Sequence, residues 1–126
     1  GRPVPEAAMP GFRANLVSGF SYNNLPGDIT WCWAGEPKLE VSLKCPKGFE
    51  GKLRLFCKDA DDFQGGRKQA LSVGGQQVAA LTDFQEGVWV ETPLTRELTA
   101  EGRVPIVITN SREGSNVVLS TIEVLE

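Results

Sequence analysis

The chain has 126 residues, of which 40% are hydrophobic and 23% charged, and its net charge is −3. This length suits a sizeable core, so we expect residues 1–126 to form one monomeric domain. The negative charge and the scattered cations argue against a nucleic-acid partner, which would need a basic stripe. The absence of histidine excludes Ser-His-Asp and Cys-His catalysis within the chain. The apolar runs are only a few residues long, so no membrane partner is expected.

A proline-rich N-terminus is followed by runs that alternate between apolar and polar residues. Three prolines fall in the first dozen residues, and we expect residues 1–20 to form an extended strap. A strand is predicted at residues 29–33, and the clearest strand signal in the chain lies at residues 38–45. One face of this second run carries Leu39, Val41, Leu43 and Cys45. A third run follows at residues 52–58, and the loop before it is predicted to be a hairpin or an arch between sheets.

Glycine and proline divide the rest of the chain into short strands and turns. Gly74 and Gly75 separate two strand-like runs and predict a two-residue hairpin, because such turns need positive φ. Pro105 predicts that its strand lies at a sheet edge or begins after a bulge. Three more strands are predicted at residues 87–94, 103–110 and 116–125. The pattern indicates an all-β fold, an antiparallel β-sandwich of jelly-roll type with about eight strands.

Three cysteines lie inside strand-like runs, where cysteine usually serves as a small apolar filler. They are Cys32, Cys45 and Cys57. An odd number leaves at least one thiol unpaired, and we favour buried free thiols over a disulfide. A zinc site is disfavoured, because three scattered thiols have no histidine to complete a tetrahedron.

Residues 58–69 read KDADDFQGGRKQ and form the most acidic stretch of the chain. A helix-loop-helix calcium loop needs oxygen ligands at alternate positions and a central glycine. Phe63 and Gln64 occupy the third ligand position and the glycine position, so this motif fails. A looser calcium site remains open, with ligands drawn from Asp59, Asp61 or Asp62.

The same aspartates could serve as the paired carboxylates of a glycoside hydrolase. Adjacent aspartates on one loop seldom hold the rigid separation that this chemistry needs, so catalysis is the weakest interpretation. We favour a turn whose charges pair locally, Arg67 or Lys68 with Asp59 or Asp61. We expect such a pair to be exposed and therefore worth only about 0–1 kcal/mol.

Four short patterns in the second half of the chain resemble those of a known family. They are a hairpin at residues 72–78, a Gly-x-Trp strand at 87–90, a strand at 102–110, and a closing Gly-x-Asn segment at 114–124. Over roughly residues 53–126 the chain resembles the galactose-binding-domain-like β-sandwiches. It looks most like the carbohydrate-binding modules that are appended to polysaccharide-degrading enzymes.

This resemblance implies a non-catalytic module that holds sugar in loops at one end or edge of the sandwich. Trp89 and Asn116 match positions that often touch the ligand in such modules. The partners implied are a polysaccharide and a tethered glycoside hydrolase or polysaccharide lyase. The location implied is secreted, periplasmic or at the cell surface, as part of a larger protein. Relatives often carry a structural calcium; Glu123 lies near one expected ligand position, but its N-terminal partner is not identifiable.

The residues themselves suggest which side chains could hold a sugar, since such sites combine flat apolar faces with a few polar groups. Trp89 alternates with valines and is expected to point outward, into a groove or over the sandwich rim. Trp31 and Trp33 share one face, as a stacking platform or as a hydrophobic lid. Tyr22 lies in a polar loop, and Arg112 would add a charge for an acidic sugar. The predicted ligand contacts are Trp89, Asn116, Trp31, Trp33, Tyr22 and Arg112.

A different function class also fits the sequence. The domain could be a structural accessory sandwich of a larger enzyme that binds no ligand. In that case the tryptophans would be buried or would lie at a domain interface, and Asn116 would only form a turn.

Overall fold

In the computed structural model, which describes residues 10–126, the chain forms antiparallel strands and one short 3₁₀ helix, η1 (Phe63–Gly65). The larger sheet has the order β1 (Arg13–Ser18), β4 (Lys38–Lys44), β9 (Arg103–Asn110), β6 (Gln69–Val73) and β7 (Gln76–Leu81). A second sheet has the order β11 (Thr121–Leu125), β5 (Gly51–Cys57) and β8 (Val88–Leu94). A third has the order β10 (Val117–Leu119), β3 (Cys32–Gly35) and β2 (Phe20–Tyr22).

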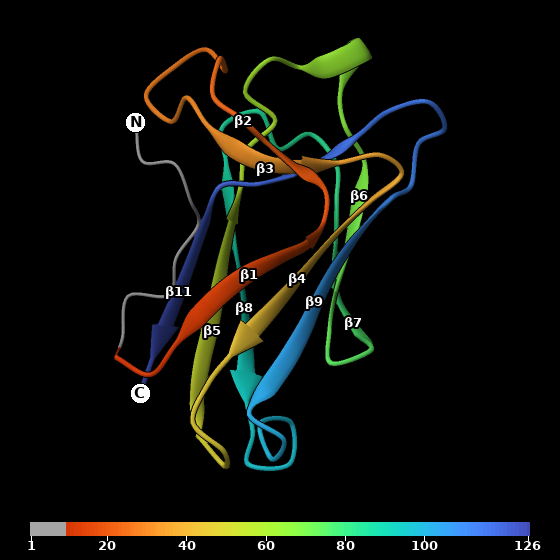
Figure 1. The fold of residues 1–126 in the computed structure, drawn as a ribbon. Coiled ribbons are helices and arrows are strands. Elements are labelled where there is room, and N and C mark those ends of the chain that lie inside the picture. The colour runs from red at the N-terminus through yellow and green to blue at the C-terminus, as the bar shows by residue number, and fades with distance from the viewer. Residues whose placement is uncertain (1–9) are drawn as a thin grey trace.

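The first two sheets stack face to face, and β2 and β3 cross over one end of the stack (Figure 1). The predicted all-β sandwich is therefore confirmed. Eleven strands are present in residues 10–126 rather than about eight. The difference comes from β1 and β2 and from a break at Ser120, which divides the last predicted strand into β10 and β11. No helix in this part of the chain is long and apolar enough to cross a membrane.

The N-terminal segment is extended in the residues that the structure describes, and these residues join two sheets. Arg13–Ser18 pairs with β4, and Phe20–Tyr22 pairs with β3. An extended segment that carries its own hydrogen-bonding groups gains by completing a sheet edge. Residues 1–9 of the predicted strap lie outside the described part of the chain.

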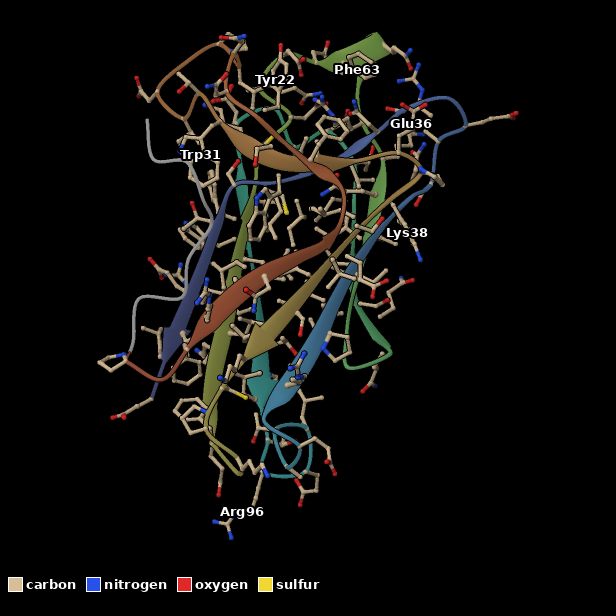
Figure 2. All side chains as sticks on the ribbon, viewed as in Figure 1. Tyr22, Trp31, Glu36, Lys38, Phe63 and Arg96 are labelled. Atoms are coloured by element: carbon tan, nitrogen blue, oxygen red, sulfur yellow. The ribbon has the colours of Figure 1, made fainter. Side chains whose placement is uncertain are left out.

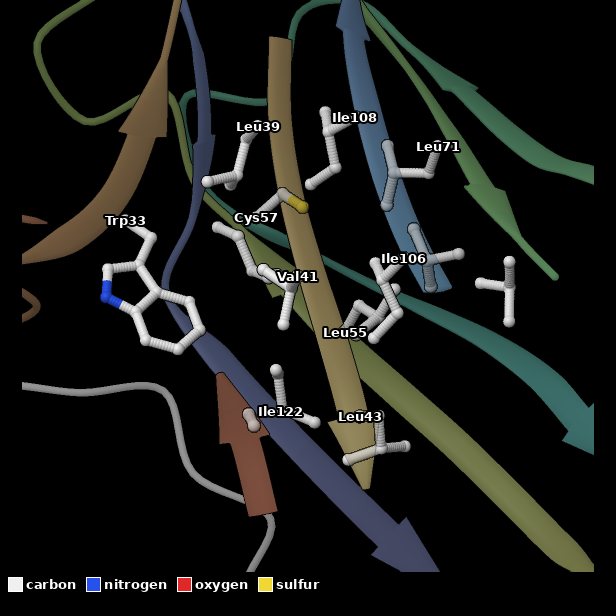
Figure 3. Packing of buried hydrophobic residues seen from close by; sticks show 14 of the residues in the cluster. Trp33, Leu39, Val41, Leu43, Leu55, Cys57, Leu71, Ile106, Ile108 and Ile122 are labelled. Carbon is white, nitrogen blue, oxygen red and sulfur yellow. The ribbon is translucent and has the colours of Figure 1, made fainter. Parts of the chain in front are cut away.

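The core lies between the two stacked sheets and is built from the alternating residues of their strands. The inward residues of β4 are fully buried, and they pack with equally buried residues of β5 and β9 (Figure 3). Each fully buried aliphatic side chain of this kind contributes about 1.5–3 kcal/mol. The core residues from these three strands are Leu39, Val41, Leu43, Leu53, Leu55, Val104, Ile106 and Ile108.

Pro105 lies in a central strand, so the prediction of an edge strand is wrong. Strand β9 has β4 on one side and β6 on the other. The carbonyl of Pro105 accepts a hydrogen bond from the N–H of Gly74 at 2.9 Å, beyond the last β6 pair, Val73 with Ile106. In an antiparallel ladder the N and O of one residue face the same neighbour. The missing N–H of Pro105 therefore faces the turn, where β6 has already ended.

The two predicted connections are present. Gly74 and Gly75 both have positive φ, +61° and +83°, and they join β6 to β7 as the expected tight hairpin. Residues 45–50 connect β4 in the larger sheet to β5 in the opposing sheet, so this loop is the arch of the two alternatives.

A buried glutamine joins the larger sheet to the sheet that crosses its end. The side chain of Gln69 donates to the carbonyl of Val118 at 2.9 Å and accepts from the N–H of Val118 at 3.0 Å. Gln69 is fully buried, so both backbone groups of Val118 depend on this one side chain. The end sheet, which carries part of the site described below, is thereby fixed to β6.

The three cysteines are free and buried, as predicted. Burial raises the pKa of the Cys32 thiol to about 11 and that of the Cys57 thiol to about 12. Burial also raises the pKa of Cys45. Since the thiolate is the reactive form, we expect all three thiols to react slowly in the folded protein.

The first prediction concerns Gln69. Changing Gln69→Leu keeps the volume but leaves the N–H and the carbonyl of Val118 buried without partners, at a cost of about 1–3 kcal/mol for each group. The free energy of unfolding from urea titration measures this loss. Gln77→Leu, on the exposed side of β7, is the matched control and should change stability by less than about 0.5 kcal/mol. Equal effects of the two changes would contradict the bridging role.

The second prediction concerns the thiols. With pKa values of about 11 and 12 for Cys32 and Cys57, the native protein should not react quickly with Ellman's reagent at pH 8, whereas the unfolded protein should release three equivalents. A folded pKa above the unfolded value stabilises the fold below pH 9.0, and this contribution should fall as the pH rises toward 12. Reaction of one thiol within seconds in the native protein would contradict its burial.

Candidate functional site

A cavity of about 260 Å³ opens beside the end sheet, and we call it the end pocket. Its walls come from β2, β3, β10 and three connecting segments that are distant in the sequence. Tyr22 and Phe63 both lie at this end of the molecule, opposite Arg96 (Figure 2). The pocket is lined by aromatic Phe20, Tyr22 and Phe63, by polar Asp61, Arg67 and Asn116, and by apolar Leu25, Cys32, Ala34 and Val118.

The aromatic wall of the end pocket comes from β2 and η1. Phe20 and Tyr22 are two residues apart on one strand, so their side chains lie on the same face. They are 46% and 43% exposed, unusually high values for large apolar rings. Phe63 faces the guanidinium of Arg67, with 5.0 Å between the guanidinium carbon and the ring centroid. Accessible aromatic rings thus stand beside a fixed polar group.

The polar wall is organised by the guanidinium of Arg67, which is only 4% exposed. Its Nη1 lies 2.5 Å from an oxygen of Asp59 and 2.5 Å from an oxygen of Asp61. Its Nε donates to the side-chain oxygen of Asn116 at 2.7 Å. One buried cation therefore connects the acidic loop with the loop that precedes β10.

The acidic loop folds back on itself so that Arg67 returns to Asp59. The Asp59 carboxylate accepts from the backbone N–H of Arg67 at 2.8 Å and from that of Phe63 at 3.3 Å. Gly65 and Gly66 have φ of +82° and +120°, conformations that side chains with a Cβ rarely adopt, and they make this reversal possible. These two glycines are therefore required by the path of this loop.

The predicted local pairing in this loop is confirmed, but its predicted exposure is wrong. Arg67 is the paired cation, and it contacts both Asp59 and Asp61. Asp59 is completely buried, so the estimate for an exposed pair does not apply. Removing one partner from a buried pair costs about 3–5 kcal/mol, because the other charge is left buried alone. The sequence could not reveal this burial, since the cover comes from other parts of the chain.

Two of the carboxylates considered for catalysis or calcium, those of Asp59 and Glu123, are engaged in other interactions. Both oxygens of Asp59 accept hydrogen bonds within the loop, so this side chain has no access to a substrate. Glu123 lies 2.7 Å from Nη1 of Arg54 on the outer face of the second sheet, far along the chain from the loop. Within residues 10–126, no three acidic, cysteine or histidine side chains gather as metal ligands.

Two of the six predicted ligand contacts meet in the end pocket. These are Tyr22 and Asn116. Trp33 is 4% exposed and belongs to the core, which confirms the packing alternative for this residue (Figure 3). Trp31 is half-buried and lies apart from Tyr22 and Phe63 (Figure 2).

Trp89 points outward, as the alternation predicted, but it lies on the outer face of the second sheet. Its ring is covered by Arg54, whose guanidinium carbon is 4.1 Å from the ring centroid. Arg54 in turn binds Glu91 at 2.8 Å. Hydrogen bonding from Lys52, joined by Arg54, holds the pKa of Glu91 below its usual value. Trp89 is 37% exposed, and it belongs to this charged sheet face rather than to the end pocket.

Arg112 lies next to the end pocket rather than inside it. Its guanidinium donates to the carbonyl of Gly66, and its backbone N–H donates to the side chain of Asn110 at 2.9 Å. It lines a second hollow of about 330 Å³, which we call the basic hollow. The lining residues are Gly65, Gly66, Arg67, Lys68, Thr82, Asp83, Ser111 and Arg112. Arg67 is common to both spaces.

Four aromatic or charged residues of the end pocket were not predicted as ligand contacts: Phe20, Phe63, Asp61 and Arg67. Phe20 could have been predicted, because it and Tyr22 are separated by one polar residue, Ser21, in a short strand. In the sequence, Phe63 stands out only as a residue that breaks a calcium motif. A large aromatic side chain in a polar loop is itself unusual, and this signal could have identified it.

We predict that Arg67→Met destabilises the fold by about 3–5 kcal/mol, because it leaves the carboxylate of Asp59 buried without its cation. Chemical denaturation measures the effect as a shift of the midpoint. Arg96→Met is the matched control: Arg96 pairs with Glu50 at 2.6 Å, but both side chains are more than half exposed, at 74% and 59%. The control should lose no more than about 1 kcal/mol. A similar, small loss in both variants would contradict the burial of the pair.

Comparison with known proteins shows which structures share this fold. The chain matches no family model and no curated protein sequence. Its structure is similar to a family 35 carbohydrate-binding module from an environmental isolate, with TM-score 0.58, 17% identity, and coverage of 96% of this chain and 90% of that chain. It is also similar to the family 35 module of Abf62 from Cellvibrio japonicus, with TM-score 0.59, 12% identity, and coverage of 97% and 92%.

A third similar structure is a GH29 fucosidase from Ruminococcus gnavus, with TM-score 0.59 and 12% identity. This match covers 98% of the present chain but only 26% of the fucosidase chain. These likenesses show the fold alone: the chain is a β-sandwich similar in structure to carbohydrate-binding modules.

Proposed function

We propose that this chain is a non-catalytic carbohydrate-binding module whose ligand site is the end pocket. The observation that carries the proposal is the meeting of three aromatic rings with a carboxylate, an amide and a guanidinium around one cavity. A pyranose ring has apolar C–H faces and a rim of hydroxyl groups. It needs flat apolar surface and a few fixed polar groups, and both are found here.

The size of the end pocket limits how much of a polysaccharide it can hold. Its volume of about 260 Å³ lies just below the range of about 300–1,000 Å³ that is typical of small-molecule sites. We therefore propose that it takes one sugar ring or the end of a chain. A small contact of this kind gives weak affinity, which suits a module that acts alongside a catalytic domain.

We further propose that the module targets a tethered glycoside hydrolase or polysaccharide lyase to its polysaccharide, as a secreted, periplasmic or cell-surface protein. The fucosidase match supports this, because a sandwich of this kind occupies 26% of that enzyme's chain. Tethering makes the second encounter intramolecular and raises the effective concentration of the catalytic domain on its substrate.

A structural accessory domain without ligand is the second candidate, and one observation favours it. Trp33 is buried and Trp31 is half-buried, as expected of tryptophans that only pack. The two candidates differ in whether the exposed rings of Phe20 and Tyr22 have a ligand.

Binding should depend on the aromatic wall. Affinity electrophoresis against a panel of soluble polysaccharides should retard the native chain in at least one gel. Tyr22→Ala and Phe63→Ala should each weaken this binding at least about tenfold, the equivalent of about 1.4 kcal/mol. Trp89→Ala is the matched control, an exposed aromatic residue on another face, and should bind as the native chain does.

Thermal unfolding of each variant checks that the fold survives the change. No retardation in any gel would favour the structural accessory domain. Loss of binding in Trp89→Ala, with Tyr22→Ala unaffected, would move the site to the outer face of the second sheet.

A further inference from the structure

The polar wall of the end pocket retains unused hydrogen-bonding groups on three side chains. Arg67 donates through Nε and Nη1, but its Nη2 makes no hydrogen bond to any of residues 10–126. Asn116 uses its oxygen for Arg67, which leaves its amide nitrogen free within the same residues. Asp61 uses Oδ1 for Arg67 and keeps Oδ2. The pocket thus offers two donors and one acceptor beside its aromatic rings.

These groups are held in place before any ligand arrives. Arg67 is 4% exposed and is held by Asp59, Asp61 and Asn116, so its guanidinium keeps one position. Nη2 is not one of the buried polar atoms that lack a partner in the described residues, so solvent reaches it. Because the guanidinium is already held in position, a ligand group that accepts from Nη2 needs no rearrangement of this side chain.

The charges around the pocket do not cancel. Arg67 contributes one positive charge, while Asp59 and Asp61 contribute two negative charges, so the cluster carries a net charge of −1. The other nearby cations, Lys68 and Arg112, line the basic hollow and not the end pocket. The guanidinium of Arg112 is also directed to the carbonyl of Gly66.

We infer that the end pocket selects neutral sugars with free neighbouring hydroxyls and discriminates against uronic acids, with Asp61 as the residue that sets this preference. The inference rests on the proposed function and names its substrate class. A hydroxyl both donates and accepts, so two adjacent hydroxyls can satisfy Oδ2 of Asp61 and Nη2 of Arg67 together. An ionised carboxylate can only accept. Where the C6 carboxylate of a uronic acid took the place of one of these hydroxyls, it would leave Oδ2 without a donor, and it would add a like charge to the cluster.

The test uses oligosaccharide pairs that differ only at C6: galactotriose with trigalacturonic acid, and equivalent glucose and mannose pairs with their uronic acids. Isothermal titration of the whole chain should give at least tenfold tighter binding to the neutral member of the pair that binds. The difference should shrink when the ionic strength rises from about 0.05 M to about 0.5 M, because salt screens the repulsion.

Asp61→Asn isolates the charge. It keeps an oxygen for Nη1 of Arg67 but makes the cluster neutral, so the preference for the neutral sugar should fall at least threefold. Asp62→Asn is the matched control, since Asp62 is exposed and bonds only Gln85 through its side chain within residues 10–126. Asparagine also tolerates the left-handed backbone of Asp62, where φ is +46°. This control should leave both affinities unchanged.

The outcomes separate the two proposals. If a uronic acid binds as tightly as its neutral partner or more tightly, the neutral-sugar inference is overturned and the carbohydrate-binding function stands. An unchanged preference in Asp61→Asn overturns the role of Asp61. If no member of any pair and no polysaccharide binds, the proposed function fails, and this inference fails with it.

Discussion

The candidate site depends on one buried ion pair, that of Asp59 with Arg67. Asp59 is fully buried and Arg67 nearly so, and a carboxylate and a guanidinium leave water only when each satisfies the other. Asp59 also accepts from the backbone of Phe63 and Arg67, so the pair sets the path of the whole acidic loop. Without it, Phe63 and Asp61 would lose the position from which they form the wall of the end pocket.

A buried ion pair is an expensive way to stabilise a fold, since an apolar pair of similar volume often does as well or better. The contribution of the pair here is to hold the side chains of the pocket in fixed positions. The guanidinium contacts Asp59, Asp61 and Asn116 from three points of the chain, and its flat geometry fixes all three at once. The fold itself is held by the aliphatic core and by Gln69, which ties the end sheet to β6. The core and Gln69 hold the sheets together, whereas the ion pair sets the geometry of the site, although breaking it would also cost stability.

Sequence reasoning succeeded where the signal is local. Alternation located the strands from β4 to β9, because successive residues of a strand point to opposite faces of its sheet. It placed the strand before them at residues 29–33, whereas β3 runs from Cys32 to Gly35, and it merged β10 with β11. It failed where the outcome depends on distant parts of the chain. Pro105 is tolerated in a central strand because the turn at Gly74 falls beside it, and nothing near Pro105 reveals this. The burial of Asp59 is of the same kind, since its cover comes from residues remote in the sequence.

The same distinction explains why the predicted site was only partly right. Tryptophan is the aromatic residue most readily associated with sugar stacking, but Trp33 fills the core and Trp89 is covered by Arg54. The rings that remain accessible at a cavity belong to phenylalanine and tyrosine, on a short edge strand and in a charged loop. Both segments lie at the end of the molecule, outside the core between the two stacked sheets (Figure 2). Rings in such segments stay exposed unless a ligand covers them, which makes the surroundings of an aromatic residue more informative than its type.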